Sequence, residues 1–387
     1  MNILFVYENP ISSFSGGVER ITFLLANYLE HDFNVFFIAF KNSIDDVDYR
    51  QSFVPNLTDI NSKENCLFIE SFIKSNDINV VLNKSATSKK ISNVLNSVDI
   101  NNAALISVLH NSVLGVAKNF SILKRKSFEN YNVGFLLKLF DFKLFKYLIL
   151  ILYKLKYSNH YKKIIINSHT VVLESNSFIK ELCYISNVYN TNNIISIPNF
   201  VNTEKNGFDV KKKELLFVGR INTYQKRVDL LLDIWAIFSV LHPDWILNVV
   251  GGGDELPKII KLSKQLDLKN IYFHGFCDAS EFYDSASIIC LTSCYEGFGI
   301  SLVEGMSRGA IPFAFNSYAS VSDIIENNVD GFLIDPFDVE EYANKLSYVA
   351  SSKINLKKFS SNALLKSQTF DLLEIGPKWK SLLNTFE

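Results

Sequence analysis

Residues 287–315, SIICLTSCYEGFGISLVEGMSRGAIPFAF, decide the fold of this chain. An apolar run (SIICLTS) leads into a glycine-rich loop (CYEGFG), a segment of helical periodicity (ISLVEGMSRG) and a second apolar run (IPFAF). Strands that are apolar on both faces and separated by a helix are typical of parallel sheets covered on each side. The stretch therefore predicts a β–α–β unit with its loop at the carboxyl end of the first strand.

The same alternation continues along the whole chain, and a segment rich in Asn, Lys and Pro at 196–214 divides it into halves of similar size. We expect an α/β protein of two Rossmann-like domains, 1–200 and 201–370, whose parallel sheets face an interdomain cleft. Residues 371–387 are expected to form a helix that crosses back to the first domain. The expected strands are 3–7, 34–40, 78–83, 103–109, 163–168, 214–219, 245–251, 270–275, 287–293 and 311–315.

Length, net charge and cysteine count exclude several classes of protein. A chain of 387 residues exceeds what one hydrophobic core serves, which agrees with two domains. A net charge of −1 excludes nucleic-acid binding through overall charge, and five scattered cysteines fit neither a disulfide framework nor a paired metal site. The chain begins in a strand pattern, so no signal peptide is expected, and no apolar run approaches the ~20 residues of a membrane span. A cytoplasmic location is expected.

Three cations follow the strand-like run ELLFVG: Arg220, Lys226 and Arg227. They stand before a predicted helix, whose dipole favours anions at that end. A diphosphate would accept charge-assisted hydrogen bonds from them, although ordinary surface cations are an equal alternative. The glycines of NVVGGGDELPK (248–258) do not complete a dinucleotide fingerprint, so a plain tight turn is the simpler interpretation of that loop.

Two carboxylates lie in the opening stretch, Glu296 in the loop and Glu304 in the helix. Glu296 precedes two glycines and has no cation near it in sequence, so it is suited to accept hydrogen bonds from sugar hydroxyls. Glu304 has two structural interpretations, a capping box with Ser301 and an i,i+4 pair with Arg308. The backbone N–H groups at the start of the helix would meet phosphate or sugar oxygens.

The first half offers weaker signals. Gly16 and Gly17 lie between the first strand and the first helix, where the backbone can approach an anion or a sugar, or simply turn. His110 follows the strand-like run AALISVL and is expected at a carboxyl end facing the cleft. A lone histidine is as often a structural hydrogen bonder as a catalyst.

Together these features resemble the retaining nucleotide-sugar glycosyltransferases of family four, which have the GT-B fold, over almost the whole chain. The most specific match is Glu296-x7-Glu304 in the setting S-x-x-E-G-F-G-x4-E-(G/A)-M-x-x-G-x-x-P. Arg220-x5-Lys226 after FVGR matches the family's phosphate clamp. IPNFVNT (197–203) resembles its P-N-G-V-D loop, with Phe200 and Asn202 as departures.

The resemblance implies a role for each matching residue. Arg220 and Lys226 would bind the donor diphosphate and stabilise the leaving nucleoside diphosphate, without a metal or other cofactor. Glu296 would hold the hydroxyls of the donor sugar, Glu304 those of the ribose, and His110 the transferred sugar. The implied catalytic residues are Glu296, Arg220, Lys226 and His110, and the implied donor-binding residues are Gly16, Gly17, Arg220, Lys226, Glu296, Phe298, Gly299, Ile300 and Glu304.

The resemblance further implies transfer of a hexosyl or N-acetylhexosaminyl group, with retention, from a nucleoside-diphosphate sugar to a saccharide or lipid-linked saccharide. A UDP-sugar is expected from family frequency, and lipopolysaccharide O-antigen or capsule synthesis in a bacterium is the expected setting. Two alternatives stay open: a non-catalytic nucleotide-sugar-binding partner subunit, and a nucleotide-sugar epimerase of the same fold. Slow hydrolysis of the donor would distinguish an enzyme from a binding protein.

One segment departs from the near-neutral charge. Residues 118–163 hold eleven lysines and arginines against two acidic residues, together with eleven aromatic residues. The segment is typical of a peripheral surface on the anionic inner face of a cytoplasmic membrane. Alternatively, it is a helical pair that packs on the first domain. The cations expected on the membrane or acceptor face are Lys124, Arg125, Lys126, Lys138, Lys143 and Lys146.

Overall fold

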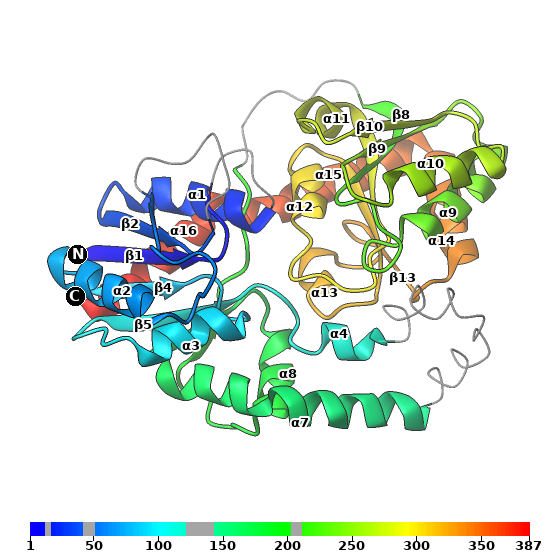
Figure 1. Cartoon of the computed structure of the whole chain (residues 1–387). Helices are drawn as coiled ribbons and strands as arrows, with labels where there is room; N and C mark the ends of the chain where they lie inside the picture. The colour runs from blue at the N-terminus through cyan, green and yellow to red at the C-terminus, as the bar shows by residue number, and fades with distance from the viewer. Residues whose placement is uncertain (12–16, 42–50, 121–142, 203–210) are drawn as a thin grey trace. The chain divides into compact units, whose positions relative to one another are not determined.

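The structure, a computed structural model, describes residues 1–11, 17–41, 51–120, 143–202 and 211–387. Its described strands form two parallel α/β sheets, as the alternating pattern predicts (Figure 1). Each sheet belongs to a separate compact unit with its own buried core.

The first unit comprises residues 1–113, 151–199 and 372–387, and the second comprises 114–150 and 200–371. The C-terminal segment thus groups with the first unit. Residues 114–120 and 143–150, which the sequence places in the first domain, group instead with the second unit.

The first unit is built on a sheet in which β1 lies between β2 and β4, because the chain starts in the middle and then winds outward in both directions. All its described strand pairs are parallel. The order is β3-β2-β1-β4-β5-β6-β7, formed by β1 Asn2–Tyr7, β2 Asn34–Ala39, β3 Gln51–Phe53, β4 Val80–Asn83, β5 Ala104–Leu109, β6 Thr170–Leu173 and β7 Ile194–Ser196.

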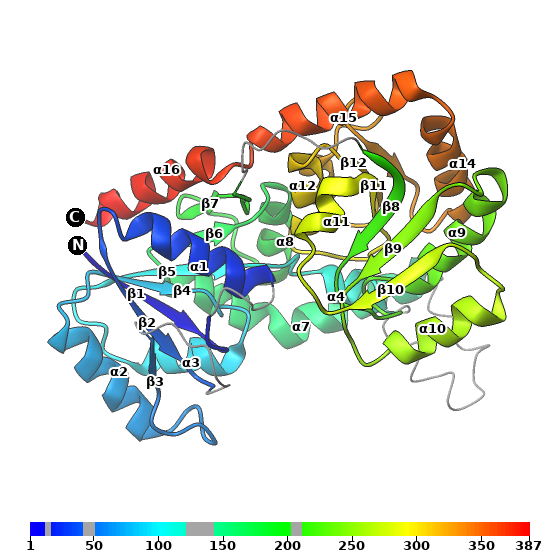
Figure 2. The same ribbon diagram turned by 90° about the horizontal axis from the view of Figure 1, so that it is seen from above.

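Helices cover both faces of this sheet (Figure 2). Successive strand side chains point to opposite faces, so Leu4 and Val6 of β1 pack with Ile69 and Ile73 of α2, while Phe5 stacks on other aromatic rings. On the face of α1, Gly376 of α16 brings the two helices so close that a Cβ there would lie 2.4 Å from the Tyr28 ring. The helices are α1 Gly17–Leu29, α2 Lys63–Ser75, α3 Lys89–Ser97, α7 Lys143–Asn167 (whose first turns group with the second unit), α8 Ser177–Ser186 and α16 Leu372–Leu383, followed by a 3-10 turn at Asn384–Phe386.

The second unit repeats the pattern. In its sheet β8 lies between β9 and β11, and all described pairs are again parallel. The strand order is β10-β9-β8-β11-β12-β13, formed by β8 Lys212–Val218, β9 Ile246–Val250, β10 Ile271–Gly275, β11 Ala286–Leu291, β12 Ile311–Phe315 and β13 Phe332–Ile334. The helices are α4 Gly115–Lys118, α9 Val228–Leu241, α10 Leu256–Gln265, α11 Ser280–Ser285, α12 Ile300–Ser307, α13 Val321–Ile324, α14 Val339–Ala350 and α15 Lys353–Gln368.

One predicted strand is wrong. Residues 163–168, KIIINS, end helix α7, and the strand is the next segment, β6 at Thr170–Leu173. Ile164 and Ile165 are buried, whereas Ile166 is 63% exposed. These isoleucines therefore belong to a helix that has one face in the core and one in solvent. In the sequence, such a short apolar run looks the same as a buried strand.

The strand order of each sheet indicates where a ligand can bind. In open α/β sheets, ligands bind beyond the carboxyl ends of the strands where the winding reverses. In the second unit this point lies between β8 and β11, so the loops 219–227 and 292–299 border it. In the first unit it lies between β1 and β4, next to Lys84.

Candidate functional site

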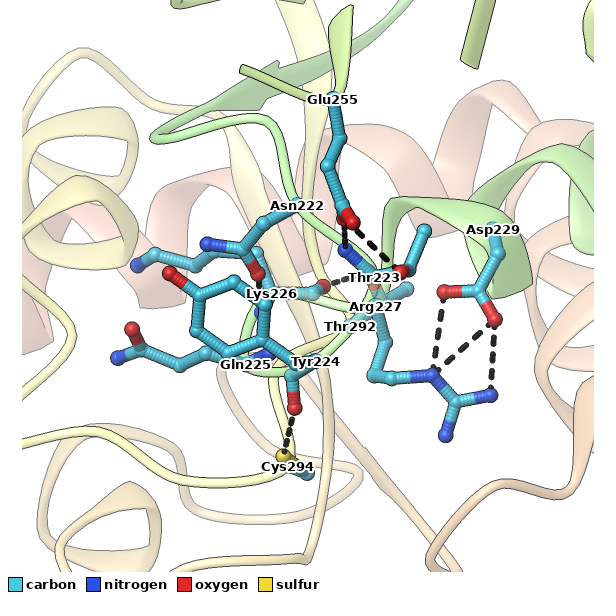
Figure 3. A network of polar contacts seen from close by, with 10 residues as sticks. All are labelled: Asn222, Thr223, Tyr224, Gln225, Lys226, Arg227, Asp229, Glu255, Thr292 and Cys294. Carbon is cyan, nitrogen blue, oxygen red and sulfur yellow. Dashed lines mark hydrogen bonds and ion pairs between the residues drawn. The ribbon is translucent and has the colours of Figure 1, made fainter. Parts of the chain in front are cut away.

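The loop after β8 is folded by one amide side chain. Asn222 accepts hydrogen bonds through Oδ1 from the backbone N–H groups of Gln225 (2.9 Å) and Lys226 (2.8 Å), as Figure 3 shows. An asparagine that caps following amides in this way closes a tight turn. Because Lys226 is one of these donors, the turn fixes where its side chain begins.

The glycines after β9 support this loop from behind. Gly251 has φ +140°, and a Cβ there would lie 1.9 Å from the carbonyl oxygen of Gly219. Glu255 then accepts hydrogen bonds from the backbone N–H and the hydroxyl of Thr223 (2.5 and 2.9 Å). The glycine-rich segment therefore packs against the β8 loop, in agreement with its failure to match a dinucleotide fingerprint.

Arg227 does not belong to an anion-binding cluster, which corrects the three-cation prediction. It is the N-cap of α9 with φ +50°, and its guanidinium is buried and paired with Asp229 at 2.9 Å. The guanidinium also lies 5.5 Å from the centre of the Phe337 ring. Arg227 is thus held within its own turn, which leaves Arg220 and Lys226 as the candidate anion-binding cations of this loop.

The loops after β8 and β11 are tied together. The Thr292 hydroxyl donates to the Lys226 carbonyl (2.8 Å), and the Cys294 N–H donates to the Gln225 carbonyl (2.8 Å). The Cys294 thiol contacts the Tyr224 carbonyl at 3.0 Å (Figure 3). These bonds join two loops that lie about 70 residues apart in sequence, and they hold Lys226 beside the glycine-rich loop that carries Glu296.

Lys226 and Glu296 form an ion pair, with Nζ 2.6 Å from Oε1. Their side chains are only 15% and 10% exposed. The sequence predicts that both belong to one site but gives no sign that they bind each other. A lysine ammonium has three donors, so this bond leaves capacity for a phosphate or sugar oxygen.

Arg220 follows β8 directly and is exposed. The charges of Arg220 and Glu296 both act on Tyr295, although burial is the main reason why its pKa rises to about 12. Arg220 thus lies near the same loop as Glu296, with its guanidinium accessible to a ligand. Among the described contacts, none joins it directly to the Lys226–Glu296 pair.

Four buried side-chain polar atoms of the second unit have no hydrogen-bond partner within the described residues. Ser347 Oγ lies on α14, and the other three are Asn222 Nδ2, Ser293 Oγ and the Tyr318 hydroxyl. The pKa of Tyr318 is raised well above its usual value by burial and by the charge of Glu296. Unpartnered buried polar groups are rare in native proteins. These three lie in or beside the two loops of the site, where a ligand would provide partners. They could not be predicted from the sequence, because nothing in their local pattern distinguishes them.

The start of α12 corrects the capping-box interpretation. The helix begins at Ile300, and its N-cap is Gly299, which has φ +103° and provides no side-chain cap. Ser301 therefore lies inside the first turn. The first N–H groups of a helix have no partner within it. Gly299 also leaves room for the Tyr318 hydroxyl, which would lie 3.0 Å from a Cβ at that position. Phe298 contributes only its backbone to this surface, because its ring is buried and packs on Phe370.

Glu304 lies on α12, where its Oε2 accepts a hydrogen bond from the Tyr283 hydroxyl at 2.7 Å. Arg308, the predicted i,i+4 partner, is paired with Asp284 at 3.1 Å. The Tyr283 hydroxyl of the neighbouring helix α11 thus holds Glu304.

In the first unit, His110 directly follows β5, as predicted, and is buried. Its Nδ1 lies 2.6 Å from Oε1 of Glu174. Burial and the charge of Lys84 lower the pKa of His110, against the opposing effect of Glu174. Gly17 begins α1, and Gly16 lies outside the described residues.

Most of the predicted basic face also lies outside the described residues, namely Lys124, Arg125, Lys126 and Lys138. Lys143 begins α7 and Lys146 is exposed on it. None of the helices in the described part of the chain is long and apolar enough to cross a membrane.

Comparison with known proteins supports the family suggested by these residues. Residues 200–366 match the family described as "Glycosyl transferases group 1". An uncharacterized glycosyltransferase of Haemophilus influenzae is 32% identical over 199 residues, which cover 50% of this chain and 56% of that protein. The amylovoran biosynthesis glycosyltransferase AmsD of Erwinia amylovora is 30% identical over 204 residues, which cover 52% and 57%. The chain thus spans about half the length of these curated relatives.

Among solved structures, Anabaena Alr3699/HepE in complex with UDP and glucose superposes with a TM-score of 0.73. The match covers 100% of both chains at 16% sequence identity. At that identity the likeness shows the fold alone, which is the two-domain GT-B fold. Residues 200–366 are therefore a group 1 glycosyl transferase domain, within a chain of GT-B fold.

Proposed function

We propose that the protein is a retaining glycosyltransferase, which moves a hexosyl or N-acetylhexosaminyl group from a UDP-sugar to a saccharide or lipid-linked saccharide of a bacterial surface polysaccharide. The observation that carries the proposal is the Lys226–Glu296 pair, with the exposed Arg220 close by. Unpartnered polar atoms of the same unit lie beside it. The relatives' names support the reaction class and, for AmsD, polysaccharide synthesis.

The donor diphosphate would bind between Arg220 and Lys226. Arg220 is exposed and can turn its planar guanidinium toward two phosphate oxygens. Lys226 would keep its bond to Glu296 and donate a second one to phosphate. Asn222 Nδ2 and the Tyr318 hydroxyl would gain the partners they lack, and the first N–H groups of α12 would meet the remaining oxygens.

Glu296 would then bind the sugar. A carboxylate with one oxygen on Lys226 keeps lone pairs for hydroxyl donors. Glu304, already bonded to Tyr283, would accept from the ribose as the resemblance implies. His110 would contact the transferred sugar from the first unit. These three roles are proposals that substitution of each residue can test separately.

For the chemical step we propose that the bond between the anomeric carbon and the phosphate oxygen breaks while the acceptor oxygen approaches the same face. The departing phosphate oxygen takes the acceptor's proton, so the products are the glycoside and a nucleoside diphosphate. Arg220 and Lys226 would stabilise the charge that develops on that phosphate, which is the electrostatic contribution that a divalent metal makes elsewhere. Activity should therefore survive removal of metals by EDTA.

Helix α7 supports a peripheral membrane location at the inner face of the cytoplasmic membrane. It carries six lysines and no acidic residue. Four leucines at helical spacing, Leu144, Leu148, Leu152 and Leu155, are between 45% and 81% exposed. A helix with an apolar stripe and lysines beside it matches an anionic bilayer surface, where a lipid-linked acceptor would be found.

Product stereochemistry is the decisive test. The purified chain would be offered a panel of nucleoside-diphosphate sugars and saccharide acceptors with and without EDTA, and the anomeric configuration of the product would be read by NMR. A product with the donor's configuration supports the proposal, and an inverted product contradicts it. Binding of donors without transfer or hydrolysis would favour the partner-subunit alternative, and a change at a ring carbon of the donor would favour an epimerase.

A further inference from the structure

Three neighbouring strands of the first unit each end at a buried ionisable residue. Lys84 follows β4, His110 follows β5 and Glu174 follows β6, and these side chains are 4%, 9% and 3% exposed. Because β4, β5 and β6 are adjacent and parallel, the three residues gather at one edge of the sheet. The proposed function assigns a role to His110 alone.

The hydrogen bonds define where the proton of His110 lies. Oε1 of Glu174 accepts a hydrogen bond from Asn199 Nδ2 (2.8 Å), so this oxygen acts as an acceptor. It also lies 2.6 Å from His110 Nδ1, which therefore carries the N–H that donates to it. The pKa of His110 is lowered by burial and then by Lys84, so the ring is neutral near pH 7 and Nε2 is a bare acceptor.

That acceptor has no partner. Nε2 of His110 is buried and makes no hydrogen bond within the described residues. A satisfied structural histidine would use both ring nitrogens, whereas this one holds a lone pair ready for a donor. Hydroxyl groups are the donors that a sugar offers.

Lys84 is the third buried ionisable residue of this group, with His110 and Glu174. Its ammonium lies 5.2 Å from the centre of the Trp379 ring, and burial lowers its pKa to about 8, against the opposing charge of Glu174. The charged groups that act on His110 are therefore Lys84, Glu174 and, with the smallest effect, Glu19. The charge of Lys84 lowers the pKa of His110 and so disfavours a second proton on the ring, whereas Glu174 raises this pKa and favours one.

We infer that Glu174, held by Asn199, is a positioning residue that keeps the proton of His110 on Nδ1, so that Nε2 accepts a hydrogen bond from a hydroxyl of the sugar substrate. The inference rests on the proposed function, because it takes the partner of Nε2 to be a sugar. A purely structural pair would have no effect on turnover beyond its effect on stability.

The first test reads the tautomer in the protein without substrate. Protein labelled with 15N-histidine would give long-range 1H–15N correlations for its six histidines, and His110→Asn would identify the signals of His110. We expect a protonated Nδ1 and an unprotonated Nε2. The Glu174→Gln side chain can donate its amide to Nδ1, so this variant should move protons to Nε2. A protonated Nε2 in the wild type would overturn the inference, whatever the enzyme does.

The second test uses turnover. Glu174→Gln should lower kcat/KM about 10-fold to 100-fold, as expected for loss of one hydrogen bond to the reacting complex. The matched control is Glu181→Gln, which removes another buried carboxylate of the same unit, bonded to Ser112 rather than to His110. It should change neither the His110 signals nor the kinetics. Wild-type kinetics in Glu174→Gln, despite an altered tautomer, would contradict the inference.

The two proposals can fail separately. If no donor is turned over, the proposed function fails. UDP-glucose added to the labelled protein would then decide the inference, because a hydroxyl bound at Nε2 must shift the Nε2 signal of His110. A shift that Glu174→Gln weakens supports the inference, and an unchanged signal at saturating UDP-glucose overturns it.

Discussion

Nζ of Lys226 lies 2.6 Å from Oε1 of Glu296, so these two predicted site residues neutralise each other. Neither side chain is more than 15% exposed. Removing one partner of a buried pair leaves an uncompensated charge, whereas removing both charges leaves none. The pair therefore allows stability and activity to be separated by three variants.

We expect Lys226→Met and Glu296→Gln each to lower the free energy of unfolding by about 1–3 kcal/mol, below the range for fully buried pairs because water still reaches the site. The double variant should recover most of that loss. Activity should fall about 10²–10³-fold in all three proteins, because charge stabilisation of the leaving phosphate or of the sugar is gone. Urea unfolding and initial rates measure the two effects.

Lys269→Met is the control for the pair. Lys269 pairs with Asp267 on the surface, where both side chains are more than 70% exposed. An exposed ion pair contributes roughly 0–1 kcal/mol, so this variant should match the wild type in both measurements. If the Lys226→Met/Glu296→Gln double variant regained activity along with stability, the pair would be structural only.

Tyr318 and Tyr342 allow a second matched comparison. Both are buried tyrosines of the second unit, but the Tyr342 hydroxyl donates to the Phe313 carbonyl at 2.7 Å, whereas the Tyr318 hydroxyl has no described partner. Tyr342→Phe should lower the free energy of unfolding by about 1–3 kcal/mol, because it leaves a buried carbonyl with one partner fewer. Tyr318→Phe should leave stability unchanged or raise it.

The same two variants should differ in the opposite sense in donor binding. Tyr318→Phe should weaken binding of UDP-glucose about tenfold, since the hydroxyl would gain its hydrogen bond only from the ligand. Tyr342→Phe should bind as the wild type does. Isothermal titration of the folded variants measures this. Unchanged affinity in Tyr318→Phe would mean that the unpartnered hydroxyl plays no part in the donor site.

Much of the architecture could be predicted from local pattern. The boundaries of β12 match the prediction, and β1, β2 and β5 match within one residue, because a buried parallel strand is apolar on both faces and needs no distant information. The short strands β3, β7 and β13 were missed, since three residues do not establish a period. The isoleucines that end α7 were misassigned because apolar composition alone does not separate a buried strand from a helix end.

The sequence predicts members of a site, whereas their contacts come only from the fold. Motif spacing indicated Lys226 and Glu296, but their pairing depends on a fold that joins residues 70 positions apart. Arg227 is predicted to join Arg220 and Lys226 in a cluster of three cations, because the sequence does not show that its side chain turns back to Asp229. Glu174 and Lys84 lie 64 and 26 positions from His110, and only the adjacency of three strands makes them neighbours.

Lys84 should make stability depend on pH. Its pKa is lowered to about 8 in the folded protein, while an unfolded chain has a lysine pKa near 10.4. Between these values the unfolded chain binds a proton that the folded protein does not, so the free energy of unfolding rises with pH, by at most about 1.4 kcal/mol per pH unit. Below pH 8 both states are protonated and the effect is flat.

We therefore expect the wild type to gain about 3 kcal/mol relative to Lys84→Met between pH 7 and pH 10.5. Other groups titrate in both proteins and cancel in the difference. Urea unfolding of the two proteins at half-unit pH intervals gives the curve. If the free energies of unfolding of the wild type and Lys84→Met changed with pH in parallel, Lys84 would keep an ordinary pKa and its burial would have no electrostatic cost.

The exposed leucines of α7 give the last prediction. Leu144 and Leu155 are 81% and 75% exposed, so replacing both by glutamate costs little folding energy but removes apolar area and adds negative charge. Each leucine buried in a bilayer surface contributes about 1.5–3 kcal/mol. The Leu144→Glu/Leu155→Glu variant should thus lose at least tenfold in partitioning onto vesicles of phosphatidylglycerol, as measured by co-sedimentation. Binding of the wild type should weaken in high salt, because salt screens the attraction between the lysines and the anionic lipids.

The matched control is Ile354→Glu/Leu365→Glu on α15, which changes two residues of similar exposure (81% and 63%) outside the basic segment. If both double variants lost binding equally, charge alone would explain the effect, and α7 would not be the docking surface.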